Sequence, residues 1–222
     1  MRPMLHHARR FAQSGFTLVE MAIVLVIVGL LLGGVLKGQE LIENARVKEA
    51  ANIIKNHAAA YYAYMDRYGN VPGDDGPVPV LQARGGSWTQ VIFGGNLNGV
   101  IDTPPLSELF SGSWEEINFY HHLRAGGFIK GDLNLWGVEA LPKHPWGGLV
   151  SVTSLPAQGR SGFSLKVCMR NVPSKGAAAL DRLLDDAIPN TGTLRANTGQ
   201  ITATGVATSY QDGQMYTICQ EI

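Results

Sequence analysis

An apolar run near the N-terminus, interrupted by a single charge, constrains the fold of this chain more than any other feature. The run covers 21 residues, Phe16 to Leu36, and apart from Thr17, Glu20 and three glycines all of them are apolar. At about 1.5 Å per residue, a helix of this length just crosses a hydrocarbon core of about 30 Å. A carboxylate inside such a segment costs about 2.5–3.5 kcal/mol, so we expect Glu20 to have a function.

Two ordinary kinds of segment begin in the same way, a cleaved signal peptide and an uncleaved signal anchor. Arg2, Arg9 and Arg10 precede the run and suit the charged region of a signal peptide. A cleaved signal should end its apolar region at a small-residue site, and residues 36–39 (Leu-Lys-Gly-Gln) do not form one. A plain anchor explains the length of the run and leaves Glu20 unexplained.

The residues around Gly15 resemble the class III leader of type IV pilins and of type II secretion pseudopilins. Gly15 precedes the expected cut, Phe16 follows it, and Glu20 is the fifth residue of the mature chain. The resemblance implies that residues 1–15 are a leader peptide, which a prepilin peptidase removes before it N-methylates Phe16. It also implies that Glu20 pairs with the Phe16 amine of a neighbouring subunit during assembly.

The helical pattern continues beyond the membrane-length run. Apolar or aromatic residues recur near the helical period among polar ones. These residues are Ile42, Ala45, Ile53, Ile54, Ala58, Tyr61, Met65 and Tyr68. Glycines and a proline in residues 69–73 end the pattern. We therefore predict one long helix, with a transmembrane and assembly part (16–37) and an amphipathic part (38–69), followed by a globular head (70–222).

The pattern of the head predicts an α+β fold. Segments that alternate or are rich in β-branched residues predict strands at 149–154, 163–169, 201–208 and 215–219. A capping box, Ser113 to Glu116, predicts a helix that ends at Gly126, and residues 177–187 predict another. With the resemblance, this implies the pilin fold, a long N-terminal helix packed on a C-terminal antiparallel sheet. We expect the tyrosines of residues 61–68 to pack against that sheet, and the four tryptophans to lie in the core.

Cys168 and Cys219 are the only cysteines of the chain. A disulfide between them would close a loop of about 50 residues, worth about 4 kcal/mol in the chain-entropy model. Two free buried thiols are the alternative. The resemblance favours the disulfide, because many type IV pilins close their C-terminal region with one.

Four segments of the head resemble a group of larger proteobacterial pilin-like proteins. In that group a glycine follows the paired aspartates of the last segment, where this chain has Ala187. The four segments are residues 68–75, 94–101, 122–129 and 184–192.

Two clusters of oxygen-bearing side chains are candidate Ca²⁺ sites, because calcium prefers six to eight oxygen ligands. The first cluster consists of Asp185, Asp186, Asn190 and Thr191, and some pseudopilins hold calcium in their C-terminal loop. The second consists of Asn96, Asn98 and Asp102. The alternative is that both clusters only form turns, in which Asp and Asn are common.

The composition argues against catalysis and against nucleic-acid binding. The 18 basic residues balance the 18 acidic ones, so no basic footprint for nucleic acid is indicated. The sequence contains no nucleophile elbow, metal-spaced histidine pair or phosphate loop, and we expect no enzymatic activity. His121 and His122 are adjacent, and we expect a polar surface there with one half-buried imidazole.

These observations predict a structural subunit of a type IV pilus-like filament. The arginines before the apolar run predict a single-pass inner-membrane protein with a cytoplasmic N-terminus and a periplasmic head. Its expected partners are membrane lipid, prepilin peptidase, an inner-membrane assembly platform and other subunits. The alternatives are a type II secretion pseudopilin and a pilus-tip subunit for adhesion or DNA uptake.

Overall fold

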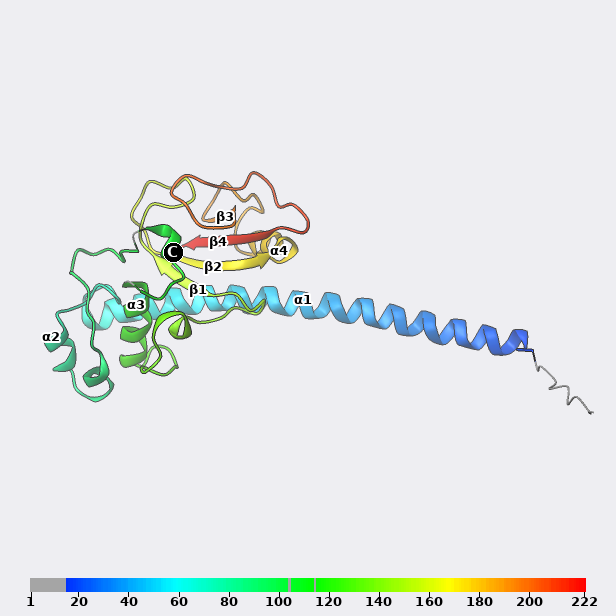
Figure 1. The fold of residues 1–222 in the computed structure, drawn as a ribbon, viewed down its shortest axis with the longest axis horizontal. Helices are drawn as coiled ribbons and strands as arrows, with labels where there is room; N and C mark the ends of the chain where they lie inside the picture. Colours follow the sequence, from blue (N-terminus) through cyan, green and yellow to red (C-terminus); the bar gives the residue numbers. More distant parts are fainter. Residues whose placement is uncertain (1–14, 104, 114) are drawn as a thin grey trace, which may run out of the picture. The chain divides into compact units, whose positions relative to one another are not determined.

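The computed structural model describes residues 15–103, 105–113 and 115–222, so leader residues 1–14 lie outside the described residues. The chain divides into two compact units, of which the first ends at Ile42 and the second runs from Glu43 to Ile222. The predicted long helix is confirmed as α1 (Leu18–Tyr68), with 51 residues (Figure 1).

In the first unit, the apolar side chains of α1 are exposed, from Leu18 to Leu36. Within the described ranges, α1 is the one helix long and apolar enough to cross a membrane. This agrees with the prediction of a single membrane-length segment.

In the second unit, one face of α1 is buried in the core. The predicted set was partly wrong, because Ile42 and Met65 are exposed, whereas small alanines form much of the buried face. A search for large apolar residues at the helical period does not find a buried helix face that consists largely of alanines. The buried residues are Val47, Ala50, Ala51, Ile54, His57, Ala60 and Tyr64.

Four antiparallel strands form one sheet in the order β1-β2-β4-β3. Their bounds are β1 (Val150–Thr153), β2 (Lys166–Pro173), β3 (Leu194–Thr198) and β4 (Met215–Glu221). The register of β2 against β4 shifts between Met169 and Val172, where Asn171 has φ 61° and forms a bulge.

The strand predictions hold for β1 and β4, whereas β2 begins later than predicted and continues to Pro173. The predicted strand at 201–208 is wrong, because the third strand is β3 and residues 201–208 form a loop. Ile201 is buried in a second core cluster with Leu109, Phe110 and the two cysteines, and this burial outside a strand explains its strand-like pattern.

Three α-helices and three short 3₁₀ segments complete the second unit. The predicted helices are confirmed as α3 (Glu115–Ala125) and α4 (Ser174–Leu184). At the start of α3, Ser113 N donates to Glu116 Oε1 at 3.3 Å, as a capping box requires. The elements not predicted are α2 (Val78–Gln82), η1 (Gly86–Gln90), η2 (Leu106–Glu108) and η3 (Gly137–Ala140).

The sheet carries core on both faces. One face packs with α1, α3 and α4, and the cyan part of α1 runs along the sheet in Figure 1. On the other face, the disulfide between Cys168 and Cys219 joins β2 to β4 and packs against Leu109, Phe110 and Ile201. The predicted pairing of the two cysteines is therefore present.

The tyrosines at the end of α1 do not pack as predicted. The ring of Tyr64 contacts Trp88, His122 and Phe128, which belong to η1, α3 and the loop after α3, and Tyr62 is exposed. Trp88 is buried, Trp136 and Trp146 are half-buried, and Trp114 lies outside the described residues.

Candidate functional site

The predicted cleavage and assembly residues surround the start of α1. Gly15 and Phe16 are exposed and precede the helix, which begins at Leu18. The backbone N–H and the hydroxyl of Thr17 both donate to Glu20 Oε2 at 2.8 Å, and Glu20 N donates to Thr17 Oγ1 at 3.2 Å. Thr17 and Glu20 therefore cap each other, as the N-cap and third residue of a helix do.

This cap gives the Glu20 carboxylate neutral hydrogen-bond donors, and Glu20 forms no ion pair among the residues that the structure describes. A negative group in the first turn also complements the partial positive charge of a helix N-terminus. The Thr-x-x-Glu spacing was visible in the sequence, but its capping role was not predicted. A cut after Gly15 would place a new α-amino group one residue before Thr17.

A buried ion pair holds the loop that follows α1. The carboxylate of Asp75 is fully buried. It accepts a hydrogen bond from Tyr64 OH at 2.6 Å and forms an ion pair with Arg84 at 2.9 Å. The guanidinium of Arg84 lies over the rings of Tyr68 and Trp88, at 4.3 and 4.6 Å from their centroids. Removing one partner of such a pair leaves the other charge buried without a partner, which typically lowers the free energy of unfolding by about 3–5 kcal/mol.

Three of the four head segments quoted for the resemblance meet at Asp74 and His122. Asp74 accepts hydrogen bonds from three backbone N–H groups of residues 96–99, at 2.6 to 3.0 Å. The N–H of Gly73 donates to His122 Nδ1 at 3.0 Å, which leaves His122 Nε2 to donate to Phe93 O at 3.2 Å. This network joins residues 68–75, 94–101 and 122–129 into one structural unit, which no sequence pattern predicted.

The expectation of a polar surface at His121 and His122 is wrong. The two side chains are 2% and 0% exposed. His121 Nε2 lies 3.0 Å from Leu135 O, and its ring centroid lies 4.2 Å from that of Trp136. Burial lowers the pKa of both imidazoles, that of His122 to about 4, so both are neutral near pH 7.

The first candidate calcium cluster is partly assembled. Carboxylate oxygens of Asp181, Asp185 and Asp186 lie within 4.8 Å of one another, and Asn190 is exposed. These carboxylates also serve turns, because Asp185 accepts from Leu194 N, Asp181 from Ala187 N, and Asp186 from Ile188 N and Thr191 Oγ1. Calcium binding at Asp185 and Asp186 stays a prediction.

The second candidate cluster is arranged as a turn. The side-chain amide nitrogens of Asn96 and Asn98 donate to Asp102 Oδ2, at 3.3 and 2.9 Å. Their amide oxygens accept from the backbone two residues ahead, at Asn98 and Val100. Because these amide groups already form hydrogen bonds within the loop, the structure favours a turn over a calcium site for this cluster.

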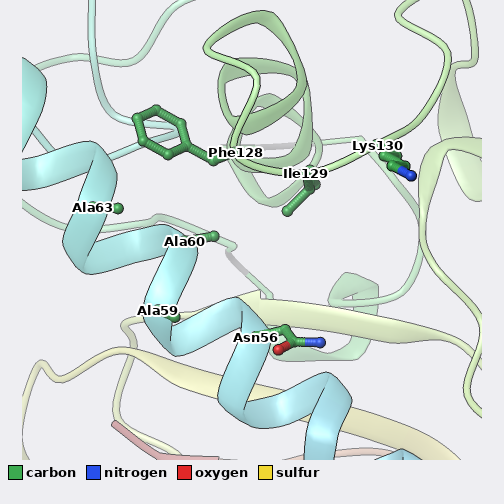
Figure 2. A pocket seen from close by; sticks show the side chains of 7 residues that line it. All are labelled: Asn56, Ala59, Ala60, Ala63, Phe128, Ile129 and Lys130. Carbon is green, nitrogen blue, oxygen red and sulfur yellow. The ribbon is translucent and has the colours of Figure 1, made fainter.

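An open groove of about 490 Å³ lies between α1 and the loop after α3 (Figure 2). Small side chains of α1 (Ala59, Ala60 and Ala63) line one wall, and Phe128 and Ile129 face them. Ala60 is a buried core residue, whereas Ala59 and Ala63 are exposed at the edge of the groove.

Comparison with known families bears on the N-terminal site. Residues 10–36 match the family model of the prokaryotic N-terminal methylation motif. The matched residues include Gly15, Phe16 and Glu20, so the chain carries the leader signature of type IV pilins and pseudopilins. No curated protein sequence matches the chain.

Proposed function

We propose that this chain is a structural subunit of a type IV pilus-like filament, cut between Gly15 and Phe16 and N-methylated on Phe16 by a prepilin peptidase. The observation that supports this most strongly is the methylation motif, which stands directly before an apolar helix with one acid. That helix is compatible with single-pass anchoring in a membrane. With Arg2, Arg9 and Arg10 on the cytoplasmic side, the head would face the periplasm until an inner-membrane platform extracts the subunit into the filament.

Glu20 selects the partner in this proposal. The hydrogen bonds that its carboxylate receives from Thr17 come from neutral donors, so in lipid they leave its charge uncompensated. The α-amino group that cleavage creates on Phe16 of a neighbouring subunit is a cation at the same end of the helix. Charge-assisted pairing in a low-dielectric environment is stronger than a neutral hydrogen bond, so docking at the correct axial register is favoured.

Capping and intersubunit pairing are separable by substitution. Glu20→Gln keeps a side chain that can cap the helix but removes the charge. Thr17→Ala removes the cap and keeps the charge. We expect both variants to be processed in the native host, and only Glu20→Gln to be missing from sheared filaments. Glu40→Gln, an exposed acid that pairs with Lys37 at 2.7 Å, is the matched control.

Filament incorporation of Glu20→Gln at the wild-type level would refute the pairing role of Glu20. Loss of assembly in Thr17→Ala together with normal assembly of Glu20→Gln would reduce that role to helix capping. A separate variant, Gly15→Leu, should keep its leader, and efficient cleavage of it would refute the assigned scissile bond.

A type II secretion pseudopilin is the second candidate, because its leader carries the same motif. The Cys168–Cys219 disulfide and the size of the head favour a pilus subunit over a short piston. Two results would favour the pseudopilin. One is a processed subunit that is found only in the inner membrane, and the other is a gene that lies beside genes for a secretin and secreted cargo. A tip subunit for adhesion is a third candidate, which glycan binding by the full chain would test.

A further inference from the structure

A cavity of about 330 Å³ lies beside the first turn of α3. It is distant in sequence from the N-terminal site and belongs to neither core cluster. Apolar and polar side chains line it together, which is the composition of small-molecule and side-chain binding sites. The lining side chains are Phe93, Ser113, Glu115, Ile117, Asn118 and Trp136, with Gly94 and Gly112 completing the wall.

Two aromatic side chains form a rigid wall. The rings of Phe93 and Trp136 meet edge to face, with centroids 5.4 Å apart and an interplanar angle of 81°. His121 supports Trp136, and the backbone carbonyl of Phe93 is held by His122. Phe93 is nevertheless 55% exposed. Aromatic faces fixed in this way attract a cation placed within about 6 Å of the ring centroid.

Asn118 lines the cavity beside Glu115 and Ile117. Its side chain is 7% exposed, and its Nδ2 donates to Gly94 O at 3.5 Å. Its Oδ1 accepts no hydrogen bond from any residue that the structure describes. An amide oxygen is a hydrogen-bond acceptor with two lone pairs, so this oxygen is available to a ligand that carries an N–H group.

The charge around the cavity is negative. Glu115 Oε2 accepts from Asp102 N at 2.9 Å, and Asp74 lies close enough to act on it electrostatically. Among described residues, no basic side chain forms an ion pair with Asp74, Asp102 or Glu115. Burial, aided by the charges of Asp74 and Asp102, raises the pKa of Glu115 to about 7. The nearby imidazoles of His121 and His122 are neutral and do not offset this charge.

We propose that this cavity binds a primary alkylammonium group, such as the side chain of a lysine or one end of a free polyamine. Its N–H groups donate to Asn118 Oδ1 and to the carboxylate of Glu115. Its alkyl chain lies against Phe93 and Trp136. Anionic ligands are disfavoured because the described lining offers them no basic partner.

The test uses the full chain in micelles of a zwitterionic detergent, with ¹⁵N-labelled tryptophan. The chain has four tryptophans, and Trp136→Phe assigns the indole signal of Trp136. The probe is n-butylammonium chloride, and the control ligand is n-butanol, which has the same chain and no charge. We expect n-butylammonium to shift the Trp136 signal in a saturable manner and n-butanol to leave it in place. Equal shifts with both ligands, or none with either, would overturn the proposal.

Two variants test the assigned contacts. Glu115→Gln should weaken n-butylammonium binding about tenfold or more, because a charge-assisted bond is lost. Glu139→Gln, which removes an exposed acid of η3 outside the cavity lining, should bind as the wild type does. Wild-type affinity should also rise from pH 6 to pH 8 as Glu115 ionises, and Glu115→Gln should lose this rise. Unchanged affinity in Glu115→Gln, with its other indole signals at wild-type positions, would overturn the assignment.

A second arm separates the two sources of the ammonium group and rests on the proposed filament function. Sheared filaments that no longer bind n-butylammonium would indicate a lysine of a neighbouring copy in the cavity. Filaments that bind it as the micellar subunit does would indicate a free amine. The micelle titration does not depend on assembly, so failure of the cavity proposal and failure of the filament proposal are distinguishable.

Discussion

Trp146 Nε1 donates a hydrogen bond to Glu43 Oε1 at 2.8 Å, across 103 residues of sequence. The indole also packs against Gly176 of α4, where an added Cβ would lie 2.6 Å from the ring. Glu43 is the first residue of the second unit, and it also lies 3.5 Å from Arg46. This contact fastens the loop before β1 to α1 at the point where the second unit begins.

Trp146 and Glu43 should therefore be energetically coupled. We expect a double-mutant cycle of Trp146→Phe and Glu43→Ala to give a coupling free energy of about 1 kcal/mol, because the bond is charge-assisted and partly exposed. Chemical denaturation of the full chain in micelles, followed by tryptophan fluorescence, measures it. Glu49→Ala, an exposed acid on the same helix, should change stability by less than about 0.5 kcal/mol. Strictly additive effects would show that the bond contributes nothing.

The disulfide between Cys168 and Cys219 should be a major source of stability. It links β2 to β4 across a sequence separation of 51 residues. We expect reduction to lower the free energy of unfolding by about 2–5 kcal/mol. The variant with Cys168→Ala and Cys219→Ala is the control, since dithiothreitol should not destabilise it further. The same unfolding midpoint with and without reductant in the wild type would contradict this expectation.

Ala187 should be a site where glycine increases stability. It has φ 66°, in the left-handed region that disfavours a Cβ, and its N–H donates to Asp181 at 3.1 Å. We expect Ala187→Gly to raise the free energy of unfolding by about 0.5–1 kcal/mol. Ala178→Gly in α4 provides the opposite control and should lower it by about 1 kcal/mol. Destabilisation by Ala187→Gly would show that the strain inferred here is absent.

Acidification should destabilise the second unit. Burial lowers the pKa of His57, His121, His122 and His144, so the unfolded chain binds more protons than the folded one below about pH 6.5. Each such proton contributes a slope of about 1.4 kcal/mol per pH unit. Glu115 and Asp181, whose pKa values burial raises, act in the opposite direction, Glu115 between about pH 4.5 and 7, but the four histidines outnumber these two carboxyl groups. Denaturation midpoints at pH 5.5 and pH 7.5 measure the net slope, and equal or higher stability at pH 5.5 would contradict it.

The elements set by local periodicity were predictable from the sequence. The membrane-length part of α1, the capping box of α3 and the strands β1 and β4 each carry a signal within one short window. The strand predicted at Ile201 was wrong, because a residue that is buried in the second core cluster outside a strand gives the same alternating pattern as a strand. Residues of β3 carry a weak pattern, and only pairing with β4 makes them a strand.

The N-terminal site was predictable because Gly15, Phe16 and Glu20 stand at fixed offsets in one short motif. The cavity beside α3 was not, because Phe93, Asn118 and Trp136 come from three separate segments. The segments of Phe93 and Asn118 are joined by the hydrogen bonds of Asp74 and His122, which link residues 22 to 49 apart. No single-sequence pattern encodes contacts of that range.

Intact-mass spectrometry of the chain from its native host, in sheared surface filaments and in inner membranes, tests the central proposal most directly. We predict, in the filament fraction, the mass of residues 16–222 plus one methyl group, less two hydrogens for the Cys168–Cys219 disulfide. The same mass in the membrane fraction alone would exclude a surface pilus subunit and favour a pseudopilin. A mass that retains residues 1–15 in both fractions would contradict processing at Gly15 and the assembly role of Glu20 that depends on it.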